Sequence, residues 1–241
     1  MTDLHENELR RVILRGVRDG LPIGLGYFAV AFSLGITAKT AGLNPVQGFV
    51  ASFLNHASAG EYALFSLIAA HAAYWEVAAV IFITNMRYLL MSAALSQKLR
   101  DDTSLLHRFL LGFGITDEIF GLGIACTGRL RPAYLYSAFL LADLFWSSGT
   151  ACGIVAGNVL PASAVSALSV AIYGMFLAII IPPARRSTGI LLAVVFGAAV
   201  SCALYYFTDI SQGFSVIISA GAAAAAAALI RPAEAEVADE V

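Results

Sequence analysis

The sequence predicts an all-α integral membrane protein that crosses the bilayer several times. Three observations indicate this class: 59% of the 241 residues are hydrophobic, only 12% are charged, and the mean hydropathy is +0.81. Soluble domains contain roughly 45–50% apolar and about 25% charged residues. A water-soluble fold of this length would be unable to cover so much apolar surface.

The apolar residues form about seven or eight hydrophobic segments, each close to the length of roughly 20 residues that spans a bilayer as a helix. They lie at residues 20–38, 45–70, 74–97, 106–127, 134–157, 163–182, 188–207 and 213–230. Turn or charge signals such as Asn44-Pro45 and Arg131-Pro132 separate them. The gaps are too short for a soluble domain, so we expect one transmembrane domain over 20–230.

Short charged tails flank this domain, at residues 1–19 and, with acidic character, at residues 231–241. The N-terminal tail carries four arginines and lacks the apolar run and small-residue cleavage site of a signal peptide. Lys and Arg concentrate on the cytoplasmic side of membrane proteins. We therefore expect a retained, cytoplasmic N-terminus on a multi-pass protein of the plasma (inner) membrane.

Composition also excludes several function classes. A formal charge of -2 provides no basic surface for nucleic acid. The three cysteines, Cys126, Cys152 and Cys202, lie inside apolar segments without metal-ligand spacing, so we interpret them as small core residues. We expect no metal and no cofactor.

The distribution of basic residues singles out the second and fourth segments, 45–70 and 106–127. Eight simple spans from a cytoplasmic N-terminus would place Lys98, Arg100 and Arg108 outside, against the usual charge rule. If both segments were broken or re-entrant, every arginine cluster would return to the cytoplasmic side. These two segments also carry polar residues in their middles.

A faint internal repeat relates residues 22–97 to residues 134–207. Each half runs from a span through a break at Asn44-Pro45 or Leu160-Pro161 to two further segments. Many secondary transporters are built from structural repeats, with the substrate near the midplane where discontinuous helices meet. Any series of helices also resembles a repeat, so the pattern leaves two structural repeats open.

Polar residues interrupt the middle of the second segment. The run is Asn55-His56-Ala57-Ser58-Ala59-Gly60-Glu61. Its small residues would let the helix open, and a freed helix N-terminus presents backbone N–H groups to an anion. The alternative is a close helix crossing through the same small residues.

The third segment contains Asn85 and Arg87 near its centre, and the fourth contains Asp117 and Glu118. Because an arginine keeps its charge in a protein, Arg87 needs an acid, a carbonyl or a water-filled cavity. We expect contact with one of these acids or with Glu61. Such a pair would either pin two helices or handle substrate and protons.

Asp143 lies in the fifth segment beside Trp146, Ser147 and Ser148. An acid at this depth is either an ion or proton site or a hydrogen-bonded structural acid. The candidate substrate-binding residues are Asn55, His56, Ser58, Ala59, Gly60, Glu61, Asn85 and Arg87. The candidate proton- or ion-coupling residues are Glu61, Asp117, Glu118 and Asp143.

Four ordered motifs carry a family resemblance. They are Gly20-Leu21-Pro22-Ile23-Gly24-Leu25-Gly26-Tyr27, Ser58-Ala59-Gly60-Glu61-Tyr62-Ala63, Thr84-Asn85-Met86-Arg87-Tyr88-Leu89-Leu90-Met91 and Thr116-Asp117-Glu118. Together they resemble the AzlC family of branched-chain amino acid exporters, the large subunit of a permease. The resemblance implies export of valine, leucine, isoleucine or related compounds with a small AzlD-type membrane subunit. Members often carry Gln where this chain has Glu61.

The leading hypothesis is a secondary exporter of small apolar amino acids driven by an ion gradient, in particular of protons. Arg87 or the backbone at 58–60 would hold the substrate carboxylate, and an acid would hold its ammonium group. No Walker-type nucleotide motif is present. The alternatives are an intramembrane enzyme using Asp117 and Asp143, or a non-transporting scaffold or channel. Homo-oligomerisation stays open.

Overall fold

The computed structural model describes residues 2–100, 102–159 and 187–230, with positions 161, 163, 177, 180, 181, 184 and 185. Within these residues the fold is helical and lacks β-strands, with an isolated bridge between Leu99 and Leu130. This confirms the predicted all-α class. Almost all of the predicted segment 163–182 and the C-terminal tail lie outside the described residues.

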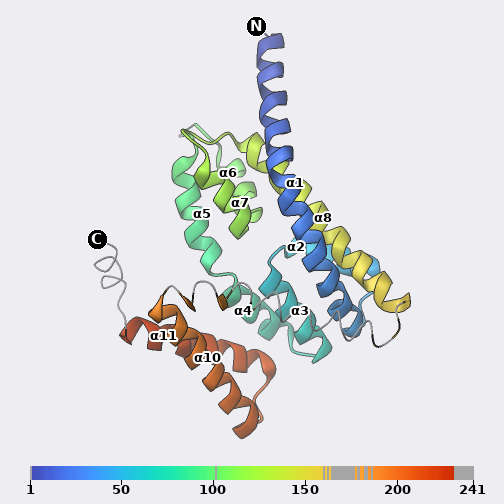
Figure 1. The fold of residues 1–241 in the computed structure, drawn as a ribbon, viewed down its shortest axis with the longest axis vertical. Coiled ribbons are helices and arrows are strands. Elements are labelled where there is room, and N and C mark those ends of the chain that lie inside the picture. Colours follow the sequence, from blue (N-terminus) through green and yellow to red (C-terminus); the bar gives the residue numbers. More distant parts are fainter. Residues whose placement is uncertain are drawn as a thin grey trace.

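Two long helices, α1 (Thr2–Thr40) and α8 (Pro132–Val159), form the central helix pair of the fold and run side by side (Figure 1). They are parallel, because Gly16 of α1 faces Tyr134 of α8 and Lys39 faces Gly157. Small residues allow the close approach: a Cβ on Gly35 would lie 2.8 Å from the Gly153 Cα. The charged N-terminal residues are the first turns of α1.

The second segment is broken, as predicted. α2 (Pro45–Leu54) and α3 (Ser58–Ala69) are separated by three non-helical residues, 55–57. The start of α2 is fixed locally, since the Asn44 side chain accepts from the Gln47 N–H at 2.9 Å and the Gln47 side chain accepts from the Asn44 N–H at 3.0 Å.

The third segment, predicted as a span, is bent and not one continuous helix. It consists of α4 (Tyr74–Thr84) and α5 (Arg87–Lys98), which meet at 48°. The break at Asn85-Met86 carries no Gly or Pro, and Asn85 packs against Gly60: a Cβ added at Gly60 would lie 2.9 Å from Asn85 Nδ2. Asn85 therefore fills the space beside the first turn of α3.

The fourth segment is also broken, as predicted. α6 (Leu105–Phe113) and α7 (Asp117–Ala125) flank the residues 114–116. Thr116 caps α7, with its hydroxyl accepting from the Ile119 N–H at 3.3 Å.

One end of the molecule gathers basic side chains on helix termini, and we call it the arginine-rich end. Lys98 donates to the Ile124 and Cys126 carbonyls at the C-terminus of α7, at 2.6 and 2.7 Å. Arg108 donates to Ser96 Oγ at 2.7 Å, beside the C-terminus of α5. Arg131 pairs with Glu8 at 3.3 Å. The start of α1, the end of α5, both ends of the α6–α7 pair and the start of α8 therefore lie together.

In this arrangement each broken segment turns back towards the end of the molecule at which it begins, and we call the two segments the re-entrant pairs. The α6–α7 pair leaves and returns at the arginine-rich end. The α2–α3 pair follows the other end of α1 and leads back to α4, which with α5 crosses towards the arginine-rich end. The two tips meet, because His56 Nε2 lies 2.5 Å from the Phe113 carbonyl oxygen.

The remaining described helices are α10 (Thr188–Phe207) and α11 (Gln212–Ile230), which pack on each other (Figure 1). α11 is attached to α4, since Glu76 accepts from the Gly213 N–H at 2.9 Å and the Trp75 and Phe214 rings lie 5.3 Å apart. A carboxylate at this position also stabilises the positive N-terminal end of α11.

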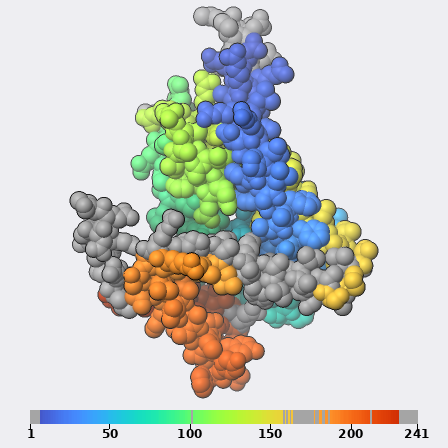
Figure 2. Space-filling view, in the orientation of Figure 1, coloured from blue at the N-terminus to red at the C-terminus, as the bar shows by residue number. Residues whose placement is uncertain are grey.

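The outer surface is apolar in the manner of a membrane protein. Among the described residues, α1, α8 and α10 are each long and apolar enough to cross a bilayer, and α4–α5 is a fourth candidate if the bent pair is one span. In Figure 2 the flank of α1 lies open over much of the height of the molecule. Leu25 on this helix is 58% exposed, and lipid would cover such side chains.

Candidate functional site

A cavity of about 240 Å³ lies where the two re-entrant tips meet. Five described elements supply almost all of its lining: α1, the α2–α3 break with the start of α3, the start of α5, the start of α7, and α8. The lining residues are Tyr27, His56, Ser58, Ala59, Arg87, Tyr88, Thr116, Asp117, Glu118, Trp146 and Ile180.

Three helices begin at this cavity, and each does so because a segment is broken there. α3 starts at Ser58, α5 at Arg87 and α7 at Asp117. The first N–H groups of a helix have no partner within it, and its N-terminus carries a partial positive charge. These helix ends favour an anionic group, beside the carboxylates of Asp117 and Glu118. At α5 the Tyr88 and Leu89 N–H groups already donate to the carbonyls of the preceding turn.

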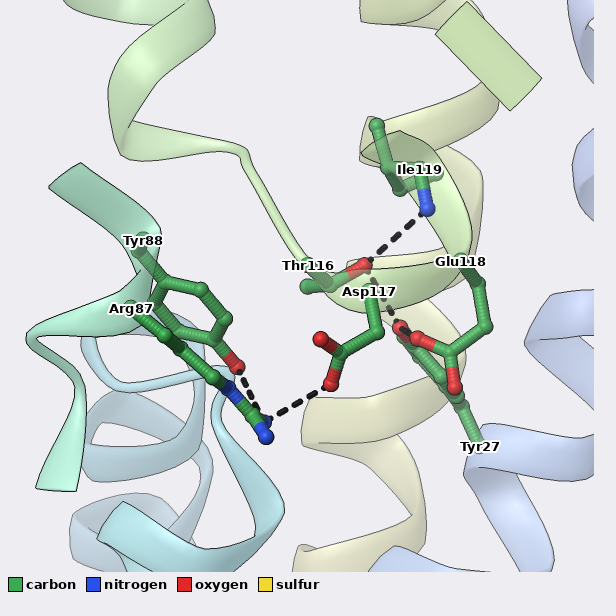
Figure 3. Close-up of polar contacts among 7 residues, drawn as sticks. All are labelled: Tyr27, Arg87, Tyr88, Thr116, Asp117, Glu118 and Ile119. Carbon is green, nitrogen blue, oxygen red and sulfur yellow. Dashed lines mark hydrogen bonds and ion pairs between the residues drawn. The ribbon is translucent and has the colours of Figure 1, made fainter. Parts of the chain in front are cut away.

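Arg87 and Asp117 form an ion pair across the cavity wall (Figure 3). Arg87 Nη2 lies 2.7 Å from Asp117 Oδ2, and the two side chains are 51% and 53% exposed. The guanidinium also lies over the Tyr88 ring, 5.2 Å from its centroid. The expected acidic partner of Arg87 is thus Asp117, in a pair that remains accessible to a ligand.

Tyr27 holds the second acid of α7. Its hydroxyl lies 2.5 Å from Glu118 Oε2 and 2.7 Å from Thr116 Oγ1 (Figure 3). Because a carboxylate only accepts, Tyr27 donates to Glu118 and Thr116 donates to Tyr27. This link ties α1 to the start of α7.

Glu61 lies behind the cavity wall. It is fully buried, and the Trp146 indole N–H donates to Oε2 at 2.5 Å. Thr150 Oγ1 lies 3.1 Å from Oε1, and Ser52 also hydrogen-bonds to that oxygen. Trp146 itself lines the cavity, so it connects Glu61 with the site.

The structure brings together six of the predicted site residues around the cavity. They are His56, Ser58, Ala59, Arg87, Asp117 and Glu118. Five others are absent from the lining: Asn55, Gly60, Glu61, Asn85 and Asp143. The roles assigned to all of them stay predictions.

Five lining residues were not among the predicted site residues: Tyr27, Tyr88, Thr116, Trp146 and Ile180. Tyr27, Tyr88 and Thr116 lie within the family motifs and Trp146 lies three residues after Asp143, whereas Ile180 carries no such sequence signal. Among the described residues, no group of three or more His, Cys, Asp or Glu side chains could hold a metal ion.

Comparisons with known proteins agree with a membrane role. The family described as AzlC protein matches residues 22–160. An uncharacterized membrane protein of Archaeoglobus fulgidus is 29% identical, over 90% of this chain and 96% of its own length. The inner membrane protein YgaZ of Escherichia coli is 27% identical, over 60% of this chain and 61% of its own length. No solved structure matches significantly.

Proposed function

Since the chain belongs to the AzlC family of membrane proteins, we propose that it is a secondary transporter that exports branched-chain or related small apolar amino acids. The observation that carries the proposal is the cavity at the re-entrant tips, where three helix N-termini converge beside an accessible ion pair. Broken helices around a central site are the common design of secondary transporters.

The cavity has the chemistry that a zwitterionic amino acid needs. Its helix N-termini and Arg87 favour a carboxylate, and Asp117 or Glu118 would accept an ammonium group. Ala59, Tyr27 and Trp146 supply apolar surface for a side chain. A volume of about 240 Å³ lies below the roughly 300–1,000 Å³ of drug-sized ligand pockets, which favours a small ligand.

The Arg87–Asp117 pair would act as a gate. A zwitterion that enters between the two side chains replaces each partner by a group of the same charge, so neither charged side chain is left without an opposite charge. The pair would re-form when the substrate leaves. The coupled ion, a proton or another cation, would be handled by Glu61, Asp117, Glu118 or Asp143.

The alternative functions receive less support. An aspartyl-type enzyme needs two facing aspartates that share a proton. Asp117 is paired with Arg87, and Asp143 is absent from the cavity lining. A scaffold would not need an accessible charge pair at such a cavity. The protein is therefore proposed not to be an enzyme.

The gathering of cations supports an orientation with the arginine-rich end, and with it the N-terminus, on the cytoplasmic side of the inner membrane. A small AzlD-type membrane subunit is the proposed protein partner. This subunit would pack against exposed apolar side chains of the present chain within the bilayer.

Transport by purified protein in vesicles tests the proposal. Vesicles loaded with radiolabelled leucine or valine should release it faster with the protein than without it, and a proton or sodium gradient should change the rate. Asp102→Asn, in an exposed loop pair with Arg100, is the matched control and should transport normally. Release equal to that of empty vesicles under every gradient, alone and with the small subunit, would refute the proposal.

A further inference from the structure

A cluster of buried polar groups lies between the α2–α3 break and α8. It consists of Asn55, His56, Asp143 and Ser147, and we call it the Asp143 cluster. Asp143 is 1% exposed and Ser147 is fully buried. Both Asp143 carboxylate oxygens, Ser147 Oγ, Asn55 Nδ2 and His56 Nδ1 have no hydrogen-bond partner among the described residues.

Contacts on either side of the cluster show that its members face each other. Ser52 Oγ lies 2.7 Å from Thr150 Oγ1, and the His56 ring lies 5.1 Å from the Phe139 ring. Phe139, Asp143, Ser147 and Thr150 follow one another at spacings of three or four residues, so they share one face of α8. Asp143 and Ser147 therefore lie opposite the segment between Ser52 and His56.

The charges here are unbalanced. Glu61 and Asp143 are both buried, and neither forms an ion pair with a Lys or Arg in the part of the chain that is described. Glu61 has three hydrogen-bond partners, whereas Asp143 has none within the described part of the chain. A buried carboxylate without a partner is costly, so Asp143 needs a bound proton or a cation.

We propose that the Asp143 cluster binds a sodium ion. The ligands would be the Asp143 carboxylate, the Ser147 hydroxyl, the Asn55 side-chain oxygen and carbonyl oxygens at the C-terminal end of α2. Rotation of the Asn55 amide by half a turn presents its oxygen where the unpartnered nitrogen lies. The C-terminal end of a helix carries a partial negative charge, and such ends coordinate sodium in transporters with broken helices.

A proton accounts for the cluster less well than a metal cation. One proton on Asp143 would occupy a single oxygen, and the other oxygen, Ser147 and Asn55 would still lack partners. A cation that takes several oxygen ligands satisfies these groups together, as buried polar groups require.

The site rests on the proposed function and deepens it by naming the coupled ion. The ion would lie at the α2 side of the α2–α3 break, and the cavity lies at the other side of the break, at the N-terminus of α3. Ordering of Asn55 and His56 around the ion would therefore fix the position of Ser58 in the cavity. Substrate and sodium would favour the same conformation of the break and bind cooperatively.

Ion binding by the purified protein in detergent tests the site without substrate or transport. We expect sodium chloride to raise the unfolding temperature saturably, relative to potassium or choline chloride of equal ionic strength, and radioactive sodium to bind at equilibrium. Asp143→Asn and, separately, Ser147→Ala should each weaken sodium binding about tenfold or more, because each removes a ligand. The matched control is Asp102→Asn, which should bind sodium as the parent does.

Three results would overturn the inference: equal effects of the three salts, sodium binding that survives both Asp143→Asn and Ser147→Ala, or loss of binding in Asp102→Asn. If Asp143→Asn fails to fold, Ser147→Ala and Asn55→Ala decide instead, because neither removes a charge. If sodium does not bind, the proposal of amino acid export still stands, because the vesicle assay measures export separately.

Discussion

At the scale of single residues, the polar groups divide into an accessible pair and a buried acid. Arg87 and Asp117 are about half exposed at the cavity, whereas Glu61 is sealed behind Trp146. An accessible pair can exchange partners with a ligand, but a sealed acid acts through its neighbours. Substitutions at the two places should therefore have different effects.

Arg87→Ala should abolish amino acid export, because it removes the carboxylate ligand and leaves Asp117 without its partner. Arg87→Lys keeps the charge but not the planar donor group, and should retain a reduced rate. Vesicle export measures both, with the unfolding temperature confirming that each variant folds. Normal export by Arg87→Ala would show that the pair only joins two helices.

Glu61→Gln should keep the fold and change the pH dependence of export. Glutamine is nearly isosteric, and its oxygen would still accept from the Trp146 N–H while its amide group donates to Ser52 or Thr150. Only the titratable charge is lost. The measurement is export across roughly pH 5 to 8, the range that a perturbed buried carboxylate reaches. An unchanged profile would assign the titrating role to another acid.

At the scale of elements, close packing of α1 against α8 sets the frame on which both re-entrant pairs are held. A Cβ added to Gly35 would overlap the Thr150 carbonyl oxygen, which is backbone and unable to move aside alone. Thr150 lies on this part of α8, and its side chain hydrogen-bonds to Ser52 of α2 and Glu61 of α3. Separation of α1 from α8 should therefore disturb the site as well.

Gly35→Ala should destabilise the protein by roughly 1–3 kcal/mol, the usual cost of overpacking. Gly26→Ala is the matched control on the same helix, since a Cβ there meets nothing within 4 Å. The control should be neutral or slightly stabilising, because alanine favours helix more than glycine does. Thermal unfolding compares the two. Equal unfolding temperatures would mean that the helices are less closely packed than described.

At the scale of the whole molecule, the re-entrant pairs determine on which side each loop lies. Both ends of the α2–α3 pair lie at one end of the molecule, and both ends of the α6–α7 pair lie at the arginine-rich end. If each pair instead crossed the membrane as a simple span, its two ends would lie on opposite sides. The topology is therefore open to a direct test.

Single cysteines, introduced after Cys126, Cys152 and Cys202 are replaced, should report this topology. Thr40→Cys and Tyr74→Cys should react with a membrane-impermeant thiol reagent from the same side, because the intervening pair does not cross. Asp102→Cys should react only from the opposite side. Labelling of Thr40→Cys and Tyr74→Cys from different sides would show that the α2–α3 pair spans the membrane.

The sequence by itself determined the membrane class, the helical fold and the breaks in the second and fourth segments. Hydropathy and interruption by polar residues are local properties, so they can be read along the chain. The basic loops also favoured re-entrant second and fourth segments, and the topology of these segments relative to a bilayer stays a prediction.

Only the tertiary structure decided which polar residues meet. Arg87 pairs with Asp117 rather than with Glu61, and Trp146 seals Glu61 from the cavity. The third segment breaks at Asn85, which packs against Gly60, and no local signal in the sequence announces this break. Each of these contacts joins segments that lie far apart along the chain: Arg87 with Asp117, and Trp146 with Glu61. Contacts between such distant segments are set by how whole helices fit together, so the residues alone leave them open.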